Sequence, residues 1–298
     1  MSPRQRMSPR QRILARFLAD RPALAALAVL AALTMAALTA PWLAQDPEAL
    51  DLTAMLTAPS WEHPLGTDEL GRDVAARLLH GGRVSLAVAG ATAALAALLG
   101  TLIGLLSGTF GGRVDAGLMR LTDGVMALPL LPLLIVLAAI DPAKLGLSAE
   151  TVNSEGFAIG RIVFIVALVG WTQVARLVRA ETLSVQARDH VRAARAIGAG
   201  PVRIMLRHIL PDVASPVIVA TTLSVGHVIL IESALSFLGL GVRPPLASWG
   251  NMLTGAVGTV ASAPTLALWP GLIILVTVLA VNRVGDGLQR ALDQRSRD

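Results

Sequence analysis

The sequence from Glu181 to Asp212 reads ETLSVQARDHVRAARAIGAGPVRIMLRHILPD and forms a charged segment between two long apolar ones. Residues 186–197 are rich in Ala and Arg, which predicts a short helix. Gly198-Ala-Gly-Pro201 ends that helix and starts another, because glycine is favoured just past a helix C-terminus and proline at a helix start. The second helix is expected over 202–209. It should stop before Pro211, because a proline disfavours the α conformation in the residue preceding it.

This helix–glycine–helix elbow, of about 30 residues, is longer than a turn between two membrane spans needs to be. Two interpretations fit the pattern: an ordered surface on which a partner docks, or a solvated loop kept basic to fix membrane topology. Five arginines lie inside the segment and two just before it: Arg188, Arg192, Arg195, Arg203 and Arg207, with Arg176 and Arg179.

The composition indicates a membrane protein. The chain has 298 residues, of which 54% are hydrophobic, and a net charge of +5. Soluble domains are less apolar, so several membrane spans are expected. The arginines gather at the ends of apolar runs, which favours membrane topology over nucleic-acid binding. There is no cysteine, which excludes disulfides and cysteine metal sites. Lys144 is the only lysine and follows Ala143, so the chain has no P-loop and is not itself an ATPase.

Six apolar runs are long enough to cross a bilayer, since about 20 helical residues span its hydrocarbon core. The expected spans are 23–44, 84–110, 118–140, 159–178, 213–240 and 266–284. Arginines precede the first span and follow the last, which predicts that both termini are cytoplasmic. The predicted fold class is therefore an all-α polytopic membrane protein with six transmembrane helices, both termini cytoplasmic, and a cytoplasmic elbow.

The expected domain organisation follows from these spans. A basic cytoplasmic tail over 1–22 is followed by the first span and an outer amphipathic segment over 23–83. A five-helix core over 84–292 contains the elbow loop 181–212, and a second cytoplasmic tail covers 293–298. Residues 1–12 repeat MSPRQR, which a start upstream of the true one or a recent duplication would both explain. We expect them to be disordered, and the first span to be a retained helix rather than a signal peptide.

The outer segment carries an acidic motif that begins at His63. Thr67 is a candidate N-cap for a helix whose first turn holds Asp68 and Glu69, where the helix dipole favours carboxylates. An apolar stripe at helical spacing predicts that this helix lies against the outer membrane face; it consists of Leu70, Val74 and Leu78. A metal site built from His63, Asp68 and Asp73 is the alternative, although capping and ion pairing already explain the carboxylates.

Several spans carry features that predict packing or function. Small residues four apart let helices approach closely, which predicts a packing face at Gly100, Gly104 and Gly108. Pro129 and Pro132 should kink the third span. Arg120 and Asp123 are three residues apart and can pair. Trp249 is expected to be an interfacial anchor in an outer loop.

Glu232 lies inside the fifth predicted span, with Ser236 one turn further on and on the same face. A carboxylate inside a membrane is costly and usually faces a bundle interior or a water-filled cavity. Glu232 and Ser236 are therefore candidates for the translocation path. A structural hydrogen bond from Glu232 to a neighbouring helix is the alternative, and the sequence leaves both open.

The segments Arg192-Ala-Ala194, Gly198 and His208-Ile-Leu-Pro211 resemble the EAA loop of ABC-importer permeases. The two alanines, the offset of the glycine and the closing Leu-Pro match the family pattern. Arg192 stands where that family usually has Glu, so a salt bridge that the family makes through this Glu is not expected in this chain. The helix–glycine–helix geometry does not depend on that residue.

Further segments carry the resemblance over most of the chain from about residue 60 to 292. They read HPLGTDELGRD from His63, ALSFLGLGV from Ala234, SWGNM from Ser248, WPG from Trp269 and VGDGL from Val284. In this order they resemble the dipeptide/oligopeptide/nickel branch of the family, and specifically the second of its two permease subunits.

The resemblance implies a type I importer fold and a heteromeric complex in the bacterial cytoplasmic (inner) membrane. A sister permease subunit would complete the path, two ATPase subunits would bind ATP and Mg below it, and an extracytoplasmic substrate-binding protein would dock outside. Neither a catalytic residue nor a metal or cofactor is expected in this chain. The resemblance assigns ATPase coupling to elbow residues Arg188, Arg192, Ala193, Ala194, Gly198, Arg203, His208 and Pro211.

The substrate and the transporter class leave alternatives open. Peptide is the favoured cargo, because the spans contain no His or carboxylate cluster at metal-ligand spacing, and nickel or another small solute is the alternative. An ion-coupled secondary transporter would need intramembrane ionisable groups, for which Asp123, His227 and Glu232 are the candidates. A membrane scaffold or sensor would not explain the elbow. A membrane enzyme is disfavoured because the sequence contains neither HExxH nor GxSxG.

Overall fold

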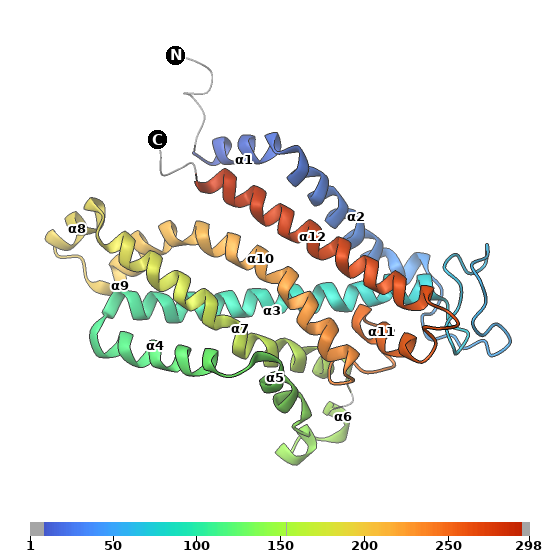
Figure 1. The fold of residues 1–298 in the computed structure, drawn as a ribbon. Helices are drawn as coiled ribbons and strands as arrows, with labels where there is room; N and C mark the ends of the chain where they lie inside the picture. Colours follow the sequence, from blue (N-terminus) through green and yellow to red (C-terminus); the bar gives the residue numbers. More distant parts are fainter. Residues whose placement is uncertain (1–8, 153, 294–298) are drawn as a thin grey trace.

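The computed structural model describes residues 9–152 and 154–293. Residues 1–8 and 294–298, which hold parts of both predicted tails, lie outside this range. The described chain is almost entirely helical, and most helices run along one common direction (Figure 1). The helices are α1 Pro9–Ala19, α2 Arg21–Leu43, α3 Val74–Phe110, α4 Gly112–Ala127, α5 Leu130–Ala139, α6 Ala149–Val152, α7 Glu155–Gln186, α8 Asp189–Ala196, α9 Pro201–Ile204, α10 Leu210–Phe237, α11 Trp249–Val257 and α12 Thr265–Asp293, with a 3-10 turn at Pro142–Leu145 and a π turn at Met205–Ile209.

The number of spans agrees with the sequence. Within residues 9–152 and 154–293, five helical segments are long and apolar enough to cross a membrane, and the bent pair α4 and α5 makes a sixth if it counts as one span. The elbow helices α8 and α9 lie at one end of the bundle, and the loop that follows α2 lies with α11 at the other (Figure 1). Both ends of the described chain point to the elbow end.

Helices α3 and α7 pack closely along the predicted glycine face, which is confirmed. A Cβ on Gly100 would lie 2.6 Å from the Trp171 carbonyl oxygen and from the Val174 Cβ. A Cβ on Gly104 would meet the Ala175 carbonyl oxygen at the same distance. The backbones can approach this closely only because these positions lack side chains.

The third span is broken rather than kinked. Helix α4 ends at Ala127, α5 begins at Leu130, and the two axes differ by 89°. Pro129 precedes α5 in an extended conformation, and Pro132 fits within the first turn of α5, where a missing N–H costs little. Asp123 does not pair with Arg120 as predicted. It accepts a hydrogen bond from Arg176 of α7, which joins α4 to its neighbour.

The amphipathic helix predicted to start at Thr67 is wrong. Helix α3 begins only at Val74, where Asp73 caps it by accepting a hydrogen bond from the Ala76 N–H at 2.6 Å, and it continues without interruption into the span. Thr67 instead fixes the preceding loop, because its hydroxyl accepts from the Thr57 N–H and donates to the Ala54 carbonyl. The apolar pattern was real, since Val74 and Leu78 are buried, but their helix is the span itself.

Trp249 is a core residue and not the predicted interfacial anchor. It is 1% exposed, it packs on Gly82, and its indole N–H donates to the Leu78 carbonyl at 2.9 Å. Helix α11 starts here because Ser248 and Asn251 form a reciprocal capping box. This short helix ties the loop after α10 to the N-terminal end of α3.

The N-terminal segment is helical from Pro9, which corrects the expected disorder of residues 9–12. Its corner with α2 packs on α12, where Gly287 leaves room for Ala23. Arg290 donates two hydrogen bonds to Asp20, at 2.6 and 3.0 Å. Those hydrogen bonds lower the pKa of the Asp20 carboxyl below its usual value and keep this corner ion-paired.

Candidate functional site

The elbow consists of α8, a left-handed glycine, α9 and the π turn that continues into α10. Gly198 has φ +87°, a conformation that residues with a Cβ rarely adopt. The Ala199 N–H reaches back to the Ala194 carbonyl at 3.1 Å, and the Gly198 N–H to the Arg195 carbonyl at 3.1 Å. These bonds close the end of α8 as glycine-terminated helices commonly do, so the predicted helix–glycine–helix geometry is confirmed.

The predicted stop before Pro211 is wrong. The helix that begins at Pro201 continues through Pro211 to Phe237 as one apolar segment. The Met205–Ile209 turn is a π turn, in which the Leu210 N–H bonds to the Met205 carbonyl five residues back. Proline inside a regular helix lacks one N–H and clashes with a carbonyl of the preceding turn, and a wider turn just before it relieves that clash.

A small hydrophobic core holds the elbow on the bundle. Val191 and Ala194 of α8, with Ile204 and Ile209 beyond the glycine, are buried. Val191, Ile204 and Ile209 belong to one cluster with Val178 of α7 and other apolar residues from the elbow ends of α3, α7 and α10. Since burial of each Val or Ile side chain contributes about 1.5–3 kcal/mol, the elbow is an ordered part of the fold and not a solvated loop.

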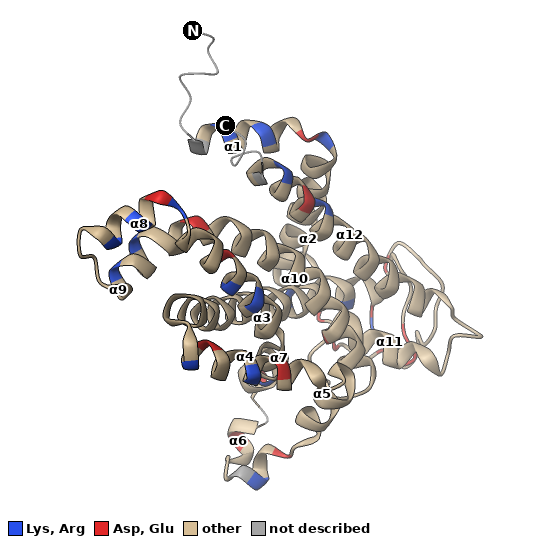
Figure 2. Ribbon diagram, turned by 60° about the vertical axis from the view of Figure 1, so that its left-hand side comes forward, with Lys and Arg blue, Asp and Glu red and all other residues tan. Residues whose placement is uncertain are grey.

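The elbow also exposes apolar residues at its tip. Ile197 is 87% exposed directly before Gly198, and Val202 and Leu206 are about half exposed on the second arm. Arginines lie on both arms of the elbow close to these residues in sequence, and charged residues mark α8 and α9 in Figure 2. A row of exposed apolar side chains rimmed by charge is typical of a protein-docking surface.

The eight residues assigned to coupling differ in how far their side chains are buried. Ala194 is buried and His208 is partly buried, while the remaining six are exposed: Arg188, Arg192, Ala193, Gly198, Arg203 and Pro211. The three apolar tip residues were not predicted as functional, although Ile197 is the one large apolar residue between Arg192 and Gly200 in the sequence.

Two ion pairs shape the exposed surface of the elbow. Arg192 Nη2 lies 2.8 Å from Asp189 Oδ1, so the arginine at the unusual position pairs within α8. Arg188 Nη1 lies 2.8 Å from Asp212 Oδ2, which links the start of α8 to the start of α10. Both pairs are largely solvent-exposed and contribute at most about 1 kcal/mol each.

Glu232 lies at the meeting point of two hydrogen-bond relays and is 0% exposed. Ser236 Oγ donates to Glu232 Oε1 at 2.7 Å and accepts from the Val242 N–H at 3.0 Å. Ser85 Oγ, from α3, donates to Oε2 at 3.1 Å and accepts from the Trp249 N–H at 3.2 Å. The carboxylate therefore fixes the 238–249 loop to both α3 and α10. The bond from Ser85 is the structural hydrogen bond to a neighbouring helix that was one of the two alternatives for Glu232. Glu232 and Ser236 share a face of α10, as expected.

A Glu232→Gln substitution should destabilise the complex by about 1–3 kcal/mol. The glutamine NH2 group replaces one carboxylate oxygen and cannot accept a hydrogen bond, so one of the two serine hydroxyls loses its acceptor. Thermal unfolding of the purified complex measures this loss. A Ser85→Ala variant is the matched control: added to Glu232→Gln, it should cost less than the sum of the two single effects. Reduced uptake with unchanged thermal stability would instead support a direct contact with cargo.

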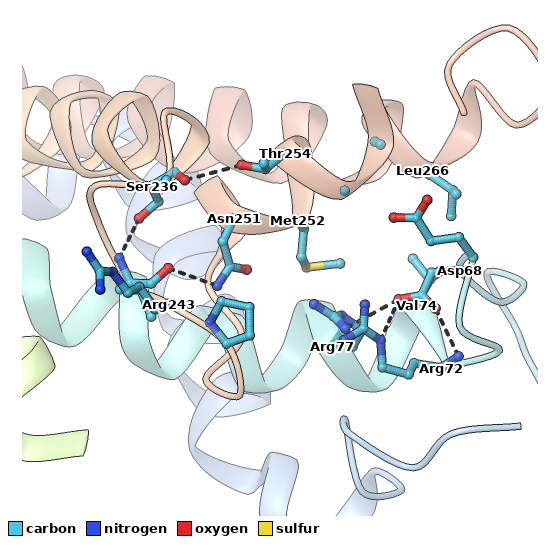
Figure 3. A pocket seen from close by; sticks show the side chains of 16 residues that line it. Asp68, Arg72, Val74, Arg77, Ser236, Arg243, Asn251, Met252, Thr254 and Leu266 are labelled. Carbon is cyan, nitrogen blue, oxygen red and sulfur yellow. Dashed lines mark hydrogen bonds and ion pairs between the residues drawn. The ribbon is translucent and has the colours of Figure 1, made fainter. Parts of the chain in front are cut away.

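A pocket of about 270 Å³ lies at the end of the bundle away from the elbow, where two of the motifs meet (Figure 3). Asp68 bridges Arg72 Nε at 2.8 Å and Arg77 Nη1 at 3.3 Å on one side. Asn251 donates to the Leu246 carbonyl at 2.7 Å and holds the opposite wall. The motifs from His63 and from Ser248 therefore build one joint, in which carboxylates are used for capping and ion pairing.

Five or six apolar spans, joined at one end by an ordered helical elbow, define a polytopic membrane protein of the importer-permease type. A family model described as binding-protein-dependent transport system inner membrane component matches residues 100–298. A second, described as N-terminal TM domain of oligopeptide transport permease C, matches residues 8–59. The chain belongs to this family: it is the permease subunit of an ABC importer and a multi-pass protein of the inner membrane.

Relatives and a solved structure agree with this membership. A putative peptide permease protein of Brucella suis is 43% identical over 97% of this chain and 92% of its own length. The nickel transport system permease protein NikC of Escherichia coli K12 is 38% identical over 90% and 92%. A chain of the inward-facing MetNI methionine ABC transporter has the same fold, with a TM-score of 0.58 and 16% identity over 72% of this chain and 95% of its own.

Proposed function

We propose that this chain is one of two permease subunits that together move di- or oligopeptides across the cytoplasmic membrane. The observation that carries the transport mechanism is the elbow, which has its own buried core and an exposed apolar tip. The peptide cargo is supported by the oligopeptide permease model over residues 8–59 and by the peptide permease among the relatives. The elbow end of the bundle, with both termini, faces the cytoplasm.

The complex needs partners that supply energy and cargo. Family membership implies ATPase and substrate-binding components, and we assign two ATPase subunits, one sister permease and one extracytoplasmic binding protein. ATP and Mg bind on the ATPase subunits, and this chain contributes no catalytic residue. Membrane lipid surrounds the spans, and nucleic acid has no role.

The elbow converts movement of an ATPase into movement of the spans. Its apolar tip and the surrounding coupling residues dock on the ATPase, while its buried side is fixed to α7 and α10. A displacement of the docked surface is therefore transmitted to both helices. Nucleotide shifts the balance between inward-open and outward-open states only by its different affinity for the two.

Nickel remains the second candidate cargo, because NikC is similar over nearly its whole length. An ion-coupled mechanism is the candidate of another class. Asp123 pairs with Arg176, and Glu232 is enclosed by serine hydroxyls, so each of these carboxylates already has a structural partner.

Mass spectrometry of the complex, purified gently from native membranes, tests the proposal. We expect a second permease, two ATPases and bound peptide. A bound nickel chelate in place of peptide would change the cargo and retain the mechanism. An active chain without an ATPase, driven by an ion gradient, would refute the coupling role of the elbow.

A further inference from the structure

Two polar side chains are exposed in the middle of apolar spans. Gln173 lies near the centre of α7 and His227 near the centre of α10, and both are exposed on the surface of this chain. A polar side chain in contact with lipid is costly at this depth, so such residues face protein or a water-filled space. This face of the bundle is therefore not a lipid-facing one.

Gln173 and His227 line the same cavity, of about 160 Å³, together with Ser224 and Thr92. Thr92 is 0% exposed, and its hydroxyl has no hydrogen-bond partner among the described residues. A buried hydroxyl without a partner beside a cavity indicates that a polar atom of a water or ligand bonds to it there. The lining is mostly apolar, and the side chains of Thr92, Gln173, Ser224 and His227 place polar groups within it.

The break between α4 and α5 forms another wall of this cavity, through Val125, Met126 and Leu128. At the end of a helix the last carbonyls have no helical donor, and Pro129 brings no N–H to replace one. Non-helical backbone at membrane depth is tolerated only where protein buries it or where it lines a water-filled cavity. The 89° bend is thus a second, independent sign that this face is covered by protein or by water and not by lipid.

The polar surface continues from the cavity toward the elbow. Arg176 lies three residues after Gln173 and hence on the same face of α7, and it pairs with Asp123 of α4. One further turn along, Arg179 Nε lies 2.5 Å from Asp115 Oδ1. A row of polar groups therefore leads from mid-membrane to the inner end, while Glu232 is sealed off from this row.

We propose that Gln173 and His227 contact the cargo in the translocation path, and that they recognise the uncharged peptide backbone. The side chains that line the cavity include no Asp, Glu, Lys or Arg. Amide, hydroxyl and imidazole groups offer both donors and acceptors, which match the N–H and C=O of a peptide group in any sequence. This inference rests on the proposed peptide transport, and it identifies where that cargo meets this chain.

Single cysteines test the proposal directly, because the chain has none of its own. Gln173→Cys and His227→Cys are made separately in the complete complex, reconstituted in lipid nanodiscs. A membrane-impermeant, positively charged methanethiosulfonate reagent is added, and its mass on this chain is followed over time. Phe164→Cys and Ile218→Cys are matched controls: each is exposed on the same helix nine residues earlier, about half a turn away.

We expect both test cysteines to react at least about tenfold faster than the controls, and tri-alanine with ATP to slow their reaction. Equal rates at all four positions, or test cysteines that the reagent does not reach while the controls react, would overturn the proposal. Fast reaction that nickel slows and tri-alanine does not would overturn the peptide assignment. Uptake of tri-alanine by the unmodified complex is measured in parallel, so failure of the proposed function is distinguished from failure of this site.

Discussion

A Gly198→Val substitution should leave the complex assembled in the membrane but cut peptide uptake about tenfold while ATP hydrolysis continues. The backbone at Gly198 has φ +87°, and a residue with a Cβ loses about 1–2 kcal/mol in that region, more when it is β-branched. Since 1.4 kcal/mol is a factor of ten, the elbow would mostly adopt another turn. Its apolar tip would then no longer be placed on the ATPase. Uptake and ATPase rates of reconstituted complexes measure the effect.

Gly200→Val is the matched control for this substitution. Gly200 lies in the same turn and is equally open, but its φ of −70° and ψ of 159° suit a β-branched residue. It should therefore remain coupled. Normal coupling in Gly198→Val, or equal loss in both variants, would show that the left-handed turn is not what links the elbow to hydrolysis.

Gly104→Ala should prevent normal accumulation of the chain, although it adds only one methyl group. The new Cβ would lie 2.6 Å from the Ala175 carbonyl oxygen and 2.6 Å from the Val178 Cβ, so two long helices must separate. Overpacking of this kind typically costs about 1–3 kcal/mol, and here the obstacle is backbone that cannot turn aside. Membrane abundance and the unfolding temperature of purified complex measure the loss.

Gly90→Ala is the control within the same helix α3. Nothing lies within 4 Å of the Cβ that it would add, and alanine favours a helix over glycine by about 1 kcal/mol. It should be neutral or mildly stabilising in this chain. Equal abundance of the two variants would show that α3 and α7 do not depend on the close approach.

The spans and the elbow could be predicted because their signals are local. Apolar runs of sufficient length define spans in any context, and the Gly198 turn needs a glycine whatever surrounds it. The start of α3 was misplaced because Thr67 and Asp73 are both acceptable caps. Only the loop contacts of Thr67 decide between them.

Features that depend on distant partners could not be predicted. Asp123 pairs with Arg176 across helices instead of with Arg120, and Trp249 is buried against Leu78, far away in the sequence. The role of Glu232 needed three elements to be placed together: α3, α10 and the 238–249 loop. Pro129 and Pro211 indicated that the helix is irregular at these two places, but not how irregular it is. Packing produces a sharp break at the first and a wide turn at the second.

The wide turn before Pro211 affects the orientation of the elbow relative to α10. A π turn inserts one residue relative to a regular helix and so rotates everything beyond it by about 100°. Ile204 and Ile209 consequently reach the same core although they are five residues apart. The turn therefore rotates the elbow about the axis of α10. The direction in which the apolar tip points is thereby set independently of the faces that α10 presents inside the membrane. Sequence change in the span and in the docking surface can then proceed separately, as long as the residue count between Pro201 and Pro211 is kept.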